Sequence, residues 1–236
     1  VLLSAGAEES QIMAKLQPIA TDMHALGNPW ISYSVYLNNS FLPGLLQLMI
    51  LLVTVFSIGS EMKRATSREW LRTADDSIII AITGKLIPQT IIFFSMGLLY
   101  LSLLYGYLHF PMHNSIWHMI FAMFLLVVAS QSFAVIIMCF APSLRIGLSV
   151  GGLVGVLSLS IAGFSFPVPA MYLPFQAISY VLPVRHYFLI YVDQALNGIP
   201  LYYSRVHYVA LILFAVASTP LLPRLKKALM RQVYVP

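Results

Sequence analysis

Residues 41–60 read FLPGLLQLMILLVTVFSIGS, and residues 61–77, which follow directly, read EMKRATSREWLRTADDS. The first stretch carries no Lys, Arg, Asp or Glu. About 20 apolar residues in a helix span the roughly 30 Å hydrocarbon core of a bilayer. The second stretch is dense in charged side chains, so the chain changes abruptly from apolar to polar. This boundary predicts a membrane-spanning helix that ends at a charged surface segment.

The composition extends this prediction to the whole chain. It has 236 residues, of which 59% are hydrophobic and 9% charged, and its mean hydropathy is +0.85. A soluble domain of this length does not need so much apolar surface. Apolar runs of this length also exclude the short alternating strands of a membrane barrel. We therefore expect an all-α polytopic membrane protein with five spanning helices, at about residues 41–60, 77–108, 115–141, 144–163 and 206–222.

Basic residues in the connecting segments predict the orientation. Nine Lys and Arg residues fall on one side of the five expected spans and three on the other, while Lys85 lies inside the second span near its basic end. Cytoplasmic loops carry an excess of Lys and Arg, so we expect the side with nine to face the cytoplasm. The nine are Lys63, Arg64, Arg68, Arg72, Arg145, Arg224, Lys226, Lys227 and Arg231, and the three are Lys15, Arg185 and Arg205.

The two ends of the chain are expected to lie outside the spans. Residues 1–40 contain breakers and mixed polarity, which favours the tail of an extracytoplasmic domain or connector over a disordered terminus. Residues 226–236 are expected to form a cytoplasmic tail. The chain begins with Val1 and shows no signal peptide, so we expect that a preceding part with an earlier span is missing. The single cysteine, Cys139, lies in an apolar run and predicts neither a disulfide framework nor a metal cluster.

Residues 164–198 are apolar and aromatic but contain four prolines, Pro167, Pro169, Pro174 and Pro183. Proline removes a backbone donor and clashes with the preceding helical turn, so this segment cannot be one straight helix. We expect short broken helices that dip into the outer leaflet and pack against the bundle. A plain extracellular loop is the alternative.

Glycines at positions 147, 151 and 155 form a repeated G-x-x-x-G in the fourth expected span. Small residues on one helix face allow two helix backbones to approach closely in a membrane. We expect Gly147, Gly151 and Gly155 to be a helix-packing face. A contact within the subunit is favoured over a contact between subunits.

The expected spans contain little chemistry of their own. No Asp or Glu lies at a span centre, and the chain has no G-x-x-x-x-G-K-[ST] motif for nucleotide. His109, His113 and His118 lack a nearby acidic residue, which favours interfacial histidines over a metal site. If the protein transports a substrate uphill, a partner must supply the energy.

The segment at residues 61–77 is the expected contact for such a partner. Thr66 or Ser67 is placed to cap a short helix in which Trp70 and Leu71 form an apolar side. Four basic and four acidic side chains cancel within the segment. Attraction to anionic lipid explains the basic residues but not the acidic ones, so docking of a protein is favoured.

Several short motifs resemble the membrane subunit of type-2 ABC exporters, the bacterial permeases related to ABCG-like half-transporters. The resemblance covers roughly residues 27–225 and depends on the order of the motifs. They are Pro43-Gly44 at the start of a span, Glu61 and Thr66 in an E-x-x-x-x-T pattern, Gly84-Lys85 with Pro88, and Gly163 with Pro167 and later Pro183. Where the family often has Glu-Lys-Glu-x-Gly-Thr, this chain has Glu61-Met62-Lys63-Arg64-Ala65-Thr66.

The resemblance implies a complete subunit of six spans in the bacterial inner membrane, paired with a second permease copy or a paralogue and with two cytoplasmic ATPase subunits. ATP and Mg would be bound by the ATPase, with no cofactor in this chain, no metal site and no nucleic-acid partner. Residues 61–77 would hold the coupling helix, with Glu61, Arg64, Thr66, Arg68, Glu69 and Trp70 as candidate coupling residues. Phe166, Pro167, Pro183 and Tyr187 would be candidates for an outer gate.

We therefore expect a permease subunit that exports a lipophilic or amphipathic substrate, drug-like or lipid-like, and that is not itself an enzyme. The membrane lipid surrounds it as a further partner. The alternative is a membrane scaffold or sensor that transports nothing and recruits a cytoplasmic partner through residues 61–77.

Overall fold

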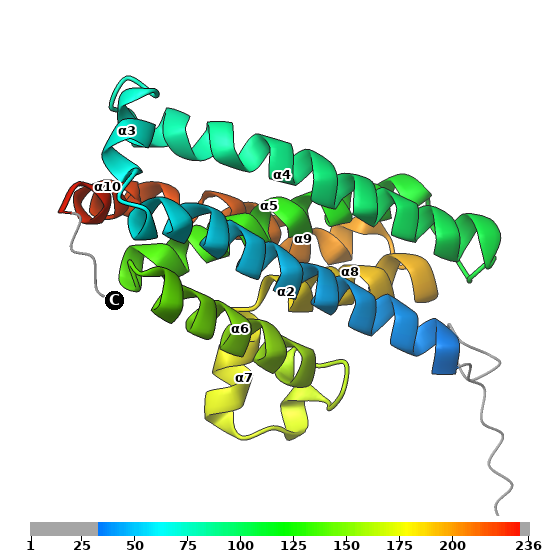
Figure 1. The fold of residues 1–236 in the computed structure, drawn as a ribbon. Helices are drawn as coiled ribbons and strands as arrows, with labels where there is room; N and C mark the ends of the chain where they lie inside the picture. The colour runs from blue at the N-terminus through cyan, green and yellow to red at the C-terminus, as the bar shows by residue number, and fades with distance from the viewer. Residues whose placement is uncertain (1–32, 232–236) are drawn as a thin grey trace, which may run out of the picture.

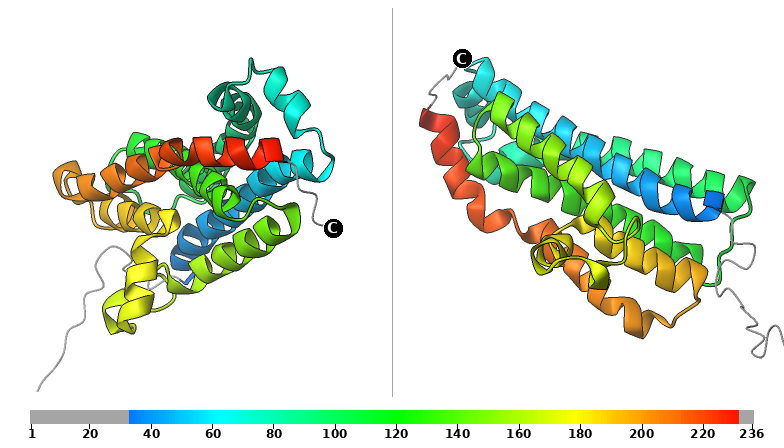
Figure 2. Two further views of the ribbon diagram at one scale, coloured as in Figure 1. Left: turned by 90° about the vertical axis from the view of Figure 1, so that its left-hand side faces the viewer. Right: turned by 90° about the horizontal axis from the view of Figure 1, so that it is seen from below.

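Five long helices run side by side along the molecule in the computed structural model, which describes residues 33–231 (Figures 1 and 2). The described residues form helices, turns and loops and contain no β-strand. Five helical stretches are long and apolar enough to cross a membrane, which confirms the expected all-α polytopic class. They are α2 (Tyr33–Lys63), α4 (Ile78–Leu101) with the π-helical η2 (Ser102–Tyr107), α5 (Ile116–Phe140), α6 (Leu144–Ile161), and α9 (Leu201–Val216) continued by η5 (Thr219–Leu221) and α10 (Leu222–Arg231).

Shorter helices connect the long ones. The helix α3 (Ser67–Arg72) lies between α2 and α4. Between α6 and α9 lie η3 (Val168–Ala170), α7 (Leu173–Tyr180), α8 (Pro183–Tyr191) and the π-helical η4 (Val192–Leu196).

The first helix begins earlier than the sequence predicted. Helix α2 starts at Tyr33, so the expected boundary at residue 40 falls inside it. The polar residues in its first turns do not break the helix, because their side chains bond to its own carbonyls. Asn39 Nδ2 donates to Val35 O at 2.9 Å, and Ser40 Oγ donates to Tyr36 O at 2.7 Å. The rest of the expected connector, residues 1–32, lies outside the described residues.

The last span also differs from the prediction of one helix at residues 206–222. Helix α9 ends at Val216, and a short turn leads into α10. Pro220 and Pro223 lie at this change of helix, and a proline cannot donate to the preceding turn. The expected cytoplasmic tail at residues 226–236 therefore begins inside α10, and residues 232–236 lie outside the described part.

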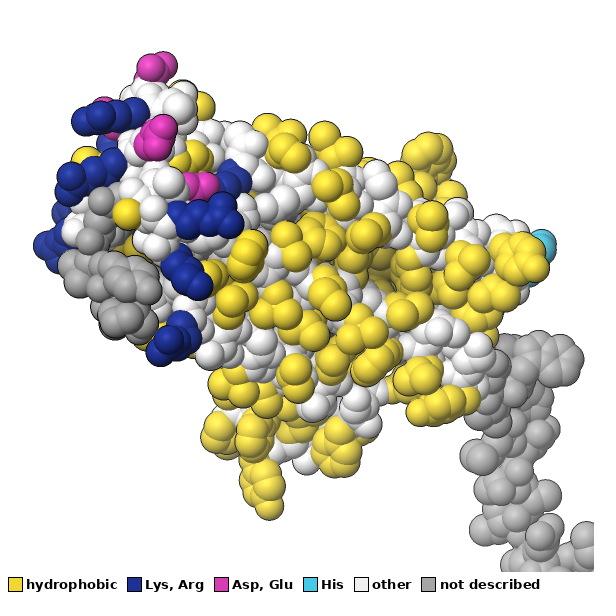
Figure 3. All heavy atoms as spheres, in the orientation of Figure 1, with side chains coloured by type: hydrophobic (Ala, Val, Ile, Leu, Met, Phe, Trp, Pro, Cys, Tyr) yellow, Lys and Arg dark blue, Asp and Glu magenta, His cyan; other side chains and the backbone are white. Residues whose placement is uncertain are grey.

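Helix α5 forms the centre of the bundle. In its most apolar window 67% of residues are buried, against 17–44% in the other four candidate spans. It contacts α2, α4, α6, α8, α9 and α10. Buried polar side chains add specific ties: Thr90 Oγ1 of α4 donates to Gln131 Oε1 of α5 at 2.8 Å. The other long helices thus expose wide apolar faces. On the face drawn in Figure 3, hydrophobic side chains cover much of the surface outside the end where Lys and Arg gather.

The glycine face of α6 packs against α2 in the same chain. A Cβ atom added at Gly155 would lie 2.3 Å from Leu48 Cδ1, and one at Gly147 would lie 2.9 Å from Val55 Cγ1. At Gly151 the closest atom, Val55 Cγ2, would be 3.6 Å away. The two backbones approach so closely that two of these three positions have no room for a side chain.

The proline-rich segment at residues 164–198 is broken into short helices, and its second half lies inside the bundle. Helix α8 packs against α9 and α5. Its first turn is capped from another helix: Gln47 Oε1 of α2 accepts from the Val184 backbone N–H at 2.8 Å, and Gln47 Nε2 donates to Ser158 Oγ of α6 at 3.1 Å. The alternative of a plain surface loop is therefore wrong for residues 183–196, because one buried glutamine joins α8 to both α2 and α6.

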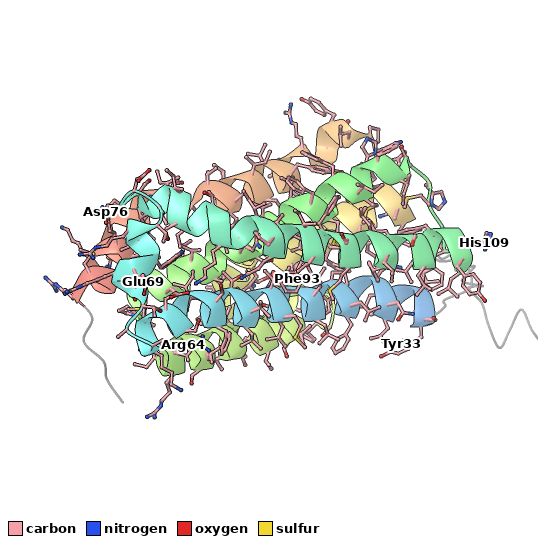
Figure 4. The ribbon with its side chains drawn as sticks, turned by 45° about the horizontal axis from the view of Figure 1, so that its top comes forward. Tyr33, Arg64, Glu69, Asp76, Phe93 and His109 are labelled. Carbon is pink, nitrogen blue, oxygen red and sulfur yellow. The ribbon has the colours of Figure 1, made fainter. Side chains whose placement is uncertain are left out.

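Charged residues gather at one end of the bundle (Figure 3). Arg64, Glu69 and Asp76 lie at this end, whereas Tyr33 and His109 lie at the other, with Phe93 between them (Figure 4). We call the first the charged end. It contains the end of α2, all of α3, the start of α4, and α10.

Candidate functional site

The sequence predicted one coupling helix within residues 61–77, and the structure divides this segment into three parts. Residues 61–63 complete α2, residues 67–72 form α3, and a turn at residues 73–77 leads into α4. The helix is therefore shorter than the predicted segment. Its attachment to the two long helices α2 and α4 makes it the centre of the charged end (Figure 4).

A tight turn closes α2 before α3 begins. Ala65 has a φ of 59°, in the left-handed region, and the Thr66 backbone N–H donates to Glu61 O at 3.0 Å. This is the bond pattern of a Schellman helix end, where glycine is usual because a Cβ is disfavoured in that conformation. The geometry gives a physical reason why glycine often occupies this position in the resembling family, and the alanine here adopts the same turn.

An ion pair joins the end of α2 to α4 beside this turn. Lys85 Nζ lies 2.5 Å from Glu61 Oε1, and the two side chains are 20% and 24% exposed. The other carboxylate oxygen, Oε2, accepts a hydrogen bond from Thr66 Oγ1. The predicted capping role of Thr66 is therefore wrong: it stands at the N-cap position of α3, but its side chain makes no cap bond because the hydroxyl is turned to Glu61.

The same lysine contacts α3. Lys85 Nζ lies 4.4 Å from the centre of the Trp70 ring, in a cation–π arrangement. Trp70 is half-buried and Leu71 fully buried, which confirms the predicted apolar side of this helix. One side chain of α4 thus holds both α2, through Glu61, and α3, through Trp70.

Helix α3 is also joined to α10, at the far end of the chain. Arg68 Nη2 donates to Met230 O at 3.2 Å, and Lys226 Nζ donates to Asp76 O at 2.5 Å. Leu71 packs in one apolar cluster with Leu225 and Leu229 of α10. The charged end is therefore a single packed unit in which α3 contacts α2, α4 and α10.

The structure brings together only part of the six predicted coupling residues. Glu61, Thr66 and Trp70 meet around Lys85, and Arg68 contacts α10. Arg64 and Glu69 are exposed. The sequence prediction placed Lys85 near the charged end but missed its role. The sequence did contain a signal for this role. Lys85 is a lone Lys within a span, and Glu61 lies at the end of the preceding span, so both fall at the same end of a helical hairpin and could have been predicted to pair.

The four predicted outer-gate residues do not form one group. Phe166 is 52% exposed and Pro167 is also exposed, on the loop before η3. Pro183 and Tyr187 are buried in α8, where Tyr187 is 1% exposed and packs in the core with α5 and α9. The resemblance suggested these four residues as gate candidates. The break at residues 181–182 separates them, because α8 packs in the bundle and the loop at residues 165–167 is exposed.

The predicted interfacial histidines have ordinary partners where the structure gives them. His113 Nδ1 lies 2.9 Å from Ala195 O, and His109 Nδ1 lies 2.9 Å from Tyr107 O. Within residues 33–231, no three His, Cys, Asp or Glu side chains come together in a way that could hold a metal ion.

A bundle of five candidate spans, with charged side chains gathered at one end beside a short helix that packs on α2, α4 and α10, defines a polytopic membrane protein. A family model described as ABC-2 family transporter protein matches residues 2–222, and the chain belongs to this family. It is therefore the membrane permease component of an ABC transporter and not itself an enzyme, and the family implies partnership with an ABC ATPase. No curated protein and no solved structure matches the chain.

Proposed function

We propose that this permease exports its substrate, and that its charged end faces the cytoplasm. The orientation is supported by the nine Lys and Arg residues that the sequence places on one side, since cytoplasmic surfaces carry such an excess. The membrane would be the bacterial inner membrane, as the resemblance implies. The direction of transport is carried over from the resembling exporters.

The mechanism is supported by the contacts of α3 with three other helices, α2, α4 and α10. Lys85 bonds Glu61 of α2 and lies over Trp70 of α3, while Arg68 of α3 bonds α10. An ATPase that pushes on α3 would therefore move the ends of three long elements together. In this mechanism, ATP-driven closure of two ATPase subunits shifts the permease between inward and outward access through α3.

The partners follow from the same mechanism. Two ATPase subunits would bind ATP and Mg, and a second permease copy or a paralogue would complete the path. Exposed side chains at the start of α3 and in the turn before it, Arg64 and Glu69, are available to meet the ATPase because they lie on the surface.

The proposed substrate is lipophilic or amphipathic, drug-like or lipid-like. An apolar groove of about 220 Å³ lies between α2 and α4 and is lined by residues such as Leu42, Met49, Met96 and Tyr100. The groove is open to the side of the bundle that would face lipid, so an apolar molecule could enter from the membrane. Its lining supports an apolar over a charged substrate, because an unpaired charge there would be costly.

The test is to reconstitute the permease with its candidate ATPase and to measure ATP hydrolysis, its stimulation by substrate, and complex formation. The variant Glu61→Gln/Arg68→Gln removes the negative charge that pairs with Lys85 and the positive charge that bonds α3 to Met230 O of α10. The matched control, Asp75→Asn/Arg145→Gln, removes one negative and one positive charge from exposed positions of the charged end that lie outside α3. We expect the first variant to bind the ATPase but to lose most of the stimulation, and the control to keep it.

Unchanged stimulation in the Glu61→Gln/Arg68→Gln variant would show that α3 does not couple the ATPase to the bundle. The scaffold or sensor alternative would be favoured by a different result. In that case the wild-type permease would bind its partner through α3 but would move no substrate across the vesicle membrane under any nucleotide condition.

A further inference from the structure

A pocket of about 440 Å³ opens at the charged end, between the end of α2, the end of α5 and one face of α10. Its lining combines two kinds of side chain. Arg224, Lys227 and Arg231 supply three positive charges, and Met62, Phe140 and Pro142 supply apolar surface. The pocket plays no part in the α3 contacts described above.

The three cations come from one helix and face the same space. Positions 224, 227 and 231 are three and four residues apart, so they fall on one side of α10, where like charges repel each other. Within residues 33–231 none of them forms an ion pair with a carboxylate, and Arg224 lies 4.6 Å from the ring centre of Phe140. A bound anion would remove this repulsion.

Lys226 shows that the arrangement is selective. It lies on the same helix, but its Nζ donates to Asp76 O at 2.5 Å and it does not line the pocket. Helix α10 therefore uses one lysine to hold the turn after α3 and directs the other three cations elsewhere. The opposite side of the helix is anchored by Leu222, Leu225 and Leu229, which are buried in the bundle.

The apolar half of the lining identifies the class of ligand. A free inorganic anion gains nothing from methionine and phenylalanine side chains, whereas a lipid carries its phosphate next to glycerol and acyl carbons. The pocket lies at the charged end, against the ends of the two candidate spans α2 and α5, where the headgroup of a surrounding lipid would lie. A protein partner is better served by the exposed, mixed charges around α3.

We propose that this pocket is a binding site for an anionic phospholipid of the leaflet at the charged end. The phosphate would bind among Arg224, Lys227 and Arg231, and the glycerol region would contact Phe140 and Met62. Because α10 is also bonded to α3, an occupied site would hold α10 in the position that supports the coupling helix. The proposal does not depend on the direction of transport or on the nature of the transported substrate.

The purified full chain in a neutral detergent is titrated with phosphatidylglycerol, and with phosphatidylcholine of the same acyl chains, while native mass spectrometry resolves each bound lipid. We expect one phosphatidylglycerol to bind more tightly than the rest. Each Lys or Arg near a lipid surface contributes about a fivefold change in affinity, so Arg224→Gln/Lys227→Gln should weaken this binding roughly 25-fold. The control Arg64→Gln/Arg72→Gln removes the same charge from exposed positions outside the pocket and should leave this binding within about twofold.

A charge-retaining variant, Arg224→Lys/Lys227→Arg, tests whether loss of binding reflects loss of charge or loss of fold, and it should keep the tight phosphatidylglycerol. Equal weakening in the pocket variant and its control would overturn the proposal, since binding would then come from the overall charge of this end. Displacement of the lipid by millimolar inorganic phosphate would also overturn it, because the site would then select a free anion. So would a pocket variant that keeps its lipid and loses only the ATPase.

Discussion

The glycine face of α6 allows a quantitative test of the packing that positions the bundle. In the Gly155→Ala variant the new Cβ would meet Leu48 at 2.3 Å from Cδ1 and at 3.2 Å from both Cβ and Cγ. Carbon atoms pack best at about 3.5–4.0 Å. Rotation of Leu48 can move Cδ1 away, but Cβ and Cγ stay close to the α2 backbone. The two helices must therefore separate by a few tenths of an ångström.

The expected cost follows from two opposing effects. Overpacking of a core costs about 1–3 kcal/mol, while replacing a helical glycine by alanine gains about 0.5–1 kcal/mol. Gly155→Ala should therefore lower the free energy of unfolding by about 1 kcal/mol. Gly151→Ala is the matched control, because its Cβ would lie 3.6 Å from Val55 Cγ2, which is ordinary contact. It should be neutral or raise stability by up to about 1 kcal/mol.

The assay is reversible unfolding in mixed micelles, with the loss of helical signal followed as denaturing detergent is added. The two variants should differ by about 1–2 kcal/mol, with Gly155→Ala the less stable. The oligomeric state is measured in parallel, because α6 packs within the chain and the substitution should not alter association. The reasoning is refuted if Gly155→Ala is as stable as Gly151→Ala, or if it changes the oligomeric state and leaves unfolding unaltered.

Three further predictions concern the charged end and α8. Glu61→Gln leaves Lys85 without its counter-ion and should lower the free energy of unfolding by about 1.5–3 kcal/mol. Lys85→Met should partly restore stability in the double variant. If the effects of the two substitutions on the free energy of unfolding are simply additive, the ion pair is contradicted. Ala65→Gly removes a Cβ from a left-handed turn and should stabilise the chain by about 1 kcal/mol, seen as a higher thermal midpoint; a lower one would contradict the turn geometry. Gln47→Leu leaves the Val184 N–H without its acceptor and should lower the free energy of unfolding by about 1–3 kcal/mol. It should also speed hydrogen exchange at the start of α8, and unchanged exchange would show that the cap is not needed.

The sequence by itself was sufficient for the features that depend on local composition. Apolar runs must be helical in lipid because their backbone groups need internal partners, so five spans and an all-α class could be predicted without any tertiary information. The charged segment after residue 60 could be placed at a polar surface for the same reason. The order of short motifs also led to the correct family, confirmed by the match over residues 2–222.

Features that depend on how one helix is rotated against another could not be read in this way. The spacing of Gly147, Gly151 and Gly155 predicted a packing face, but only the structure shows α2 as its partner. The ends of helices were also displaced where local bonds competed with the apolar pattern, as at Asn39 and Ser40. Composition predicts that a span is present better than the residues at which its helix begins and ends.

The candidate site shows the same division. The sequence predicted a charged segment with an apolar side on its short helix, and it named Glu61, Thr66 and Trp70. Only the tertiary structure showed that Glu61 and Trp70 both contact Lys85, that Thr66 bonds Glu61, and that α3 is bonded to α10 from the far end of the chain. It also showed that Tyr187 is buried in the core cluster, whereas Phe166 is exposed. The physical reason is that burial in lipid depends on the composition of each segment alone. An ion pair or a capped helix instead requires two segments to lie at a fixed position relative to each other, and the packing of the whole bundle sets that position.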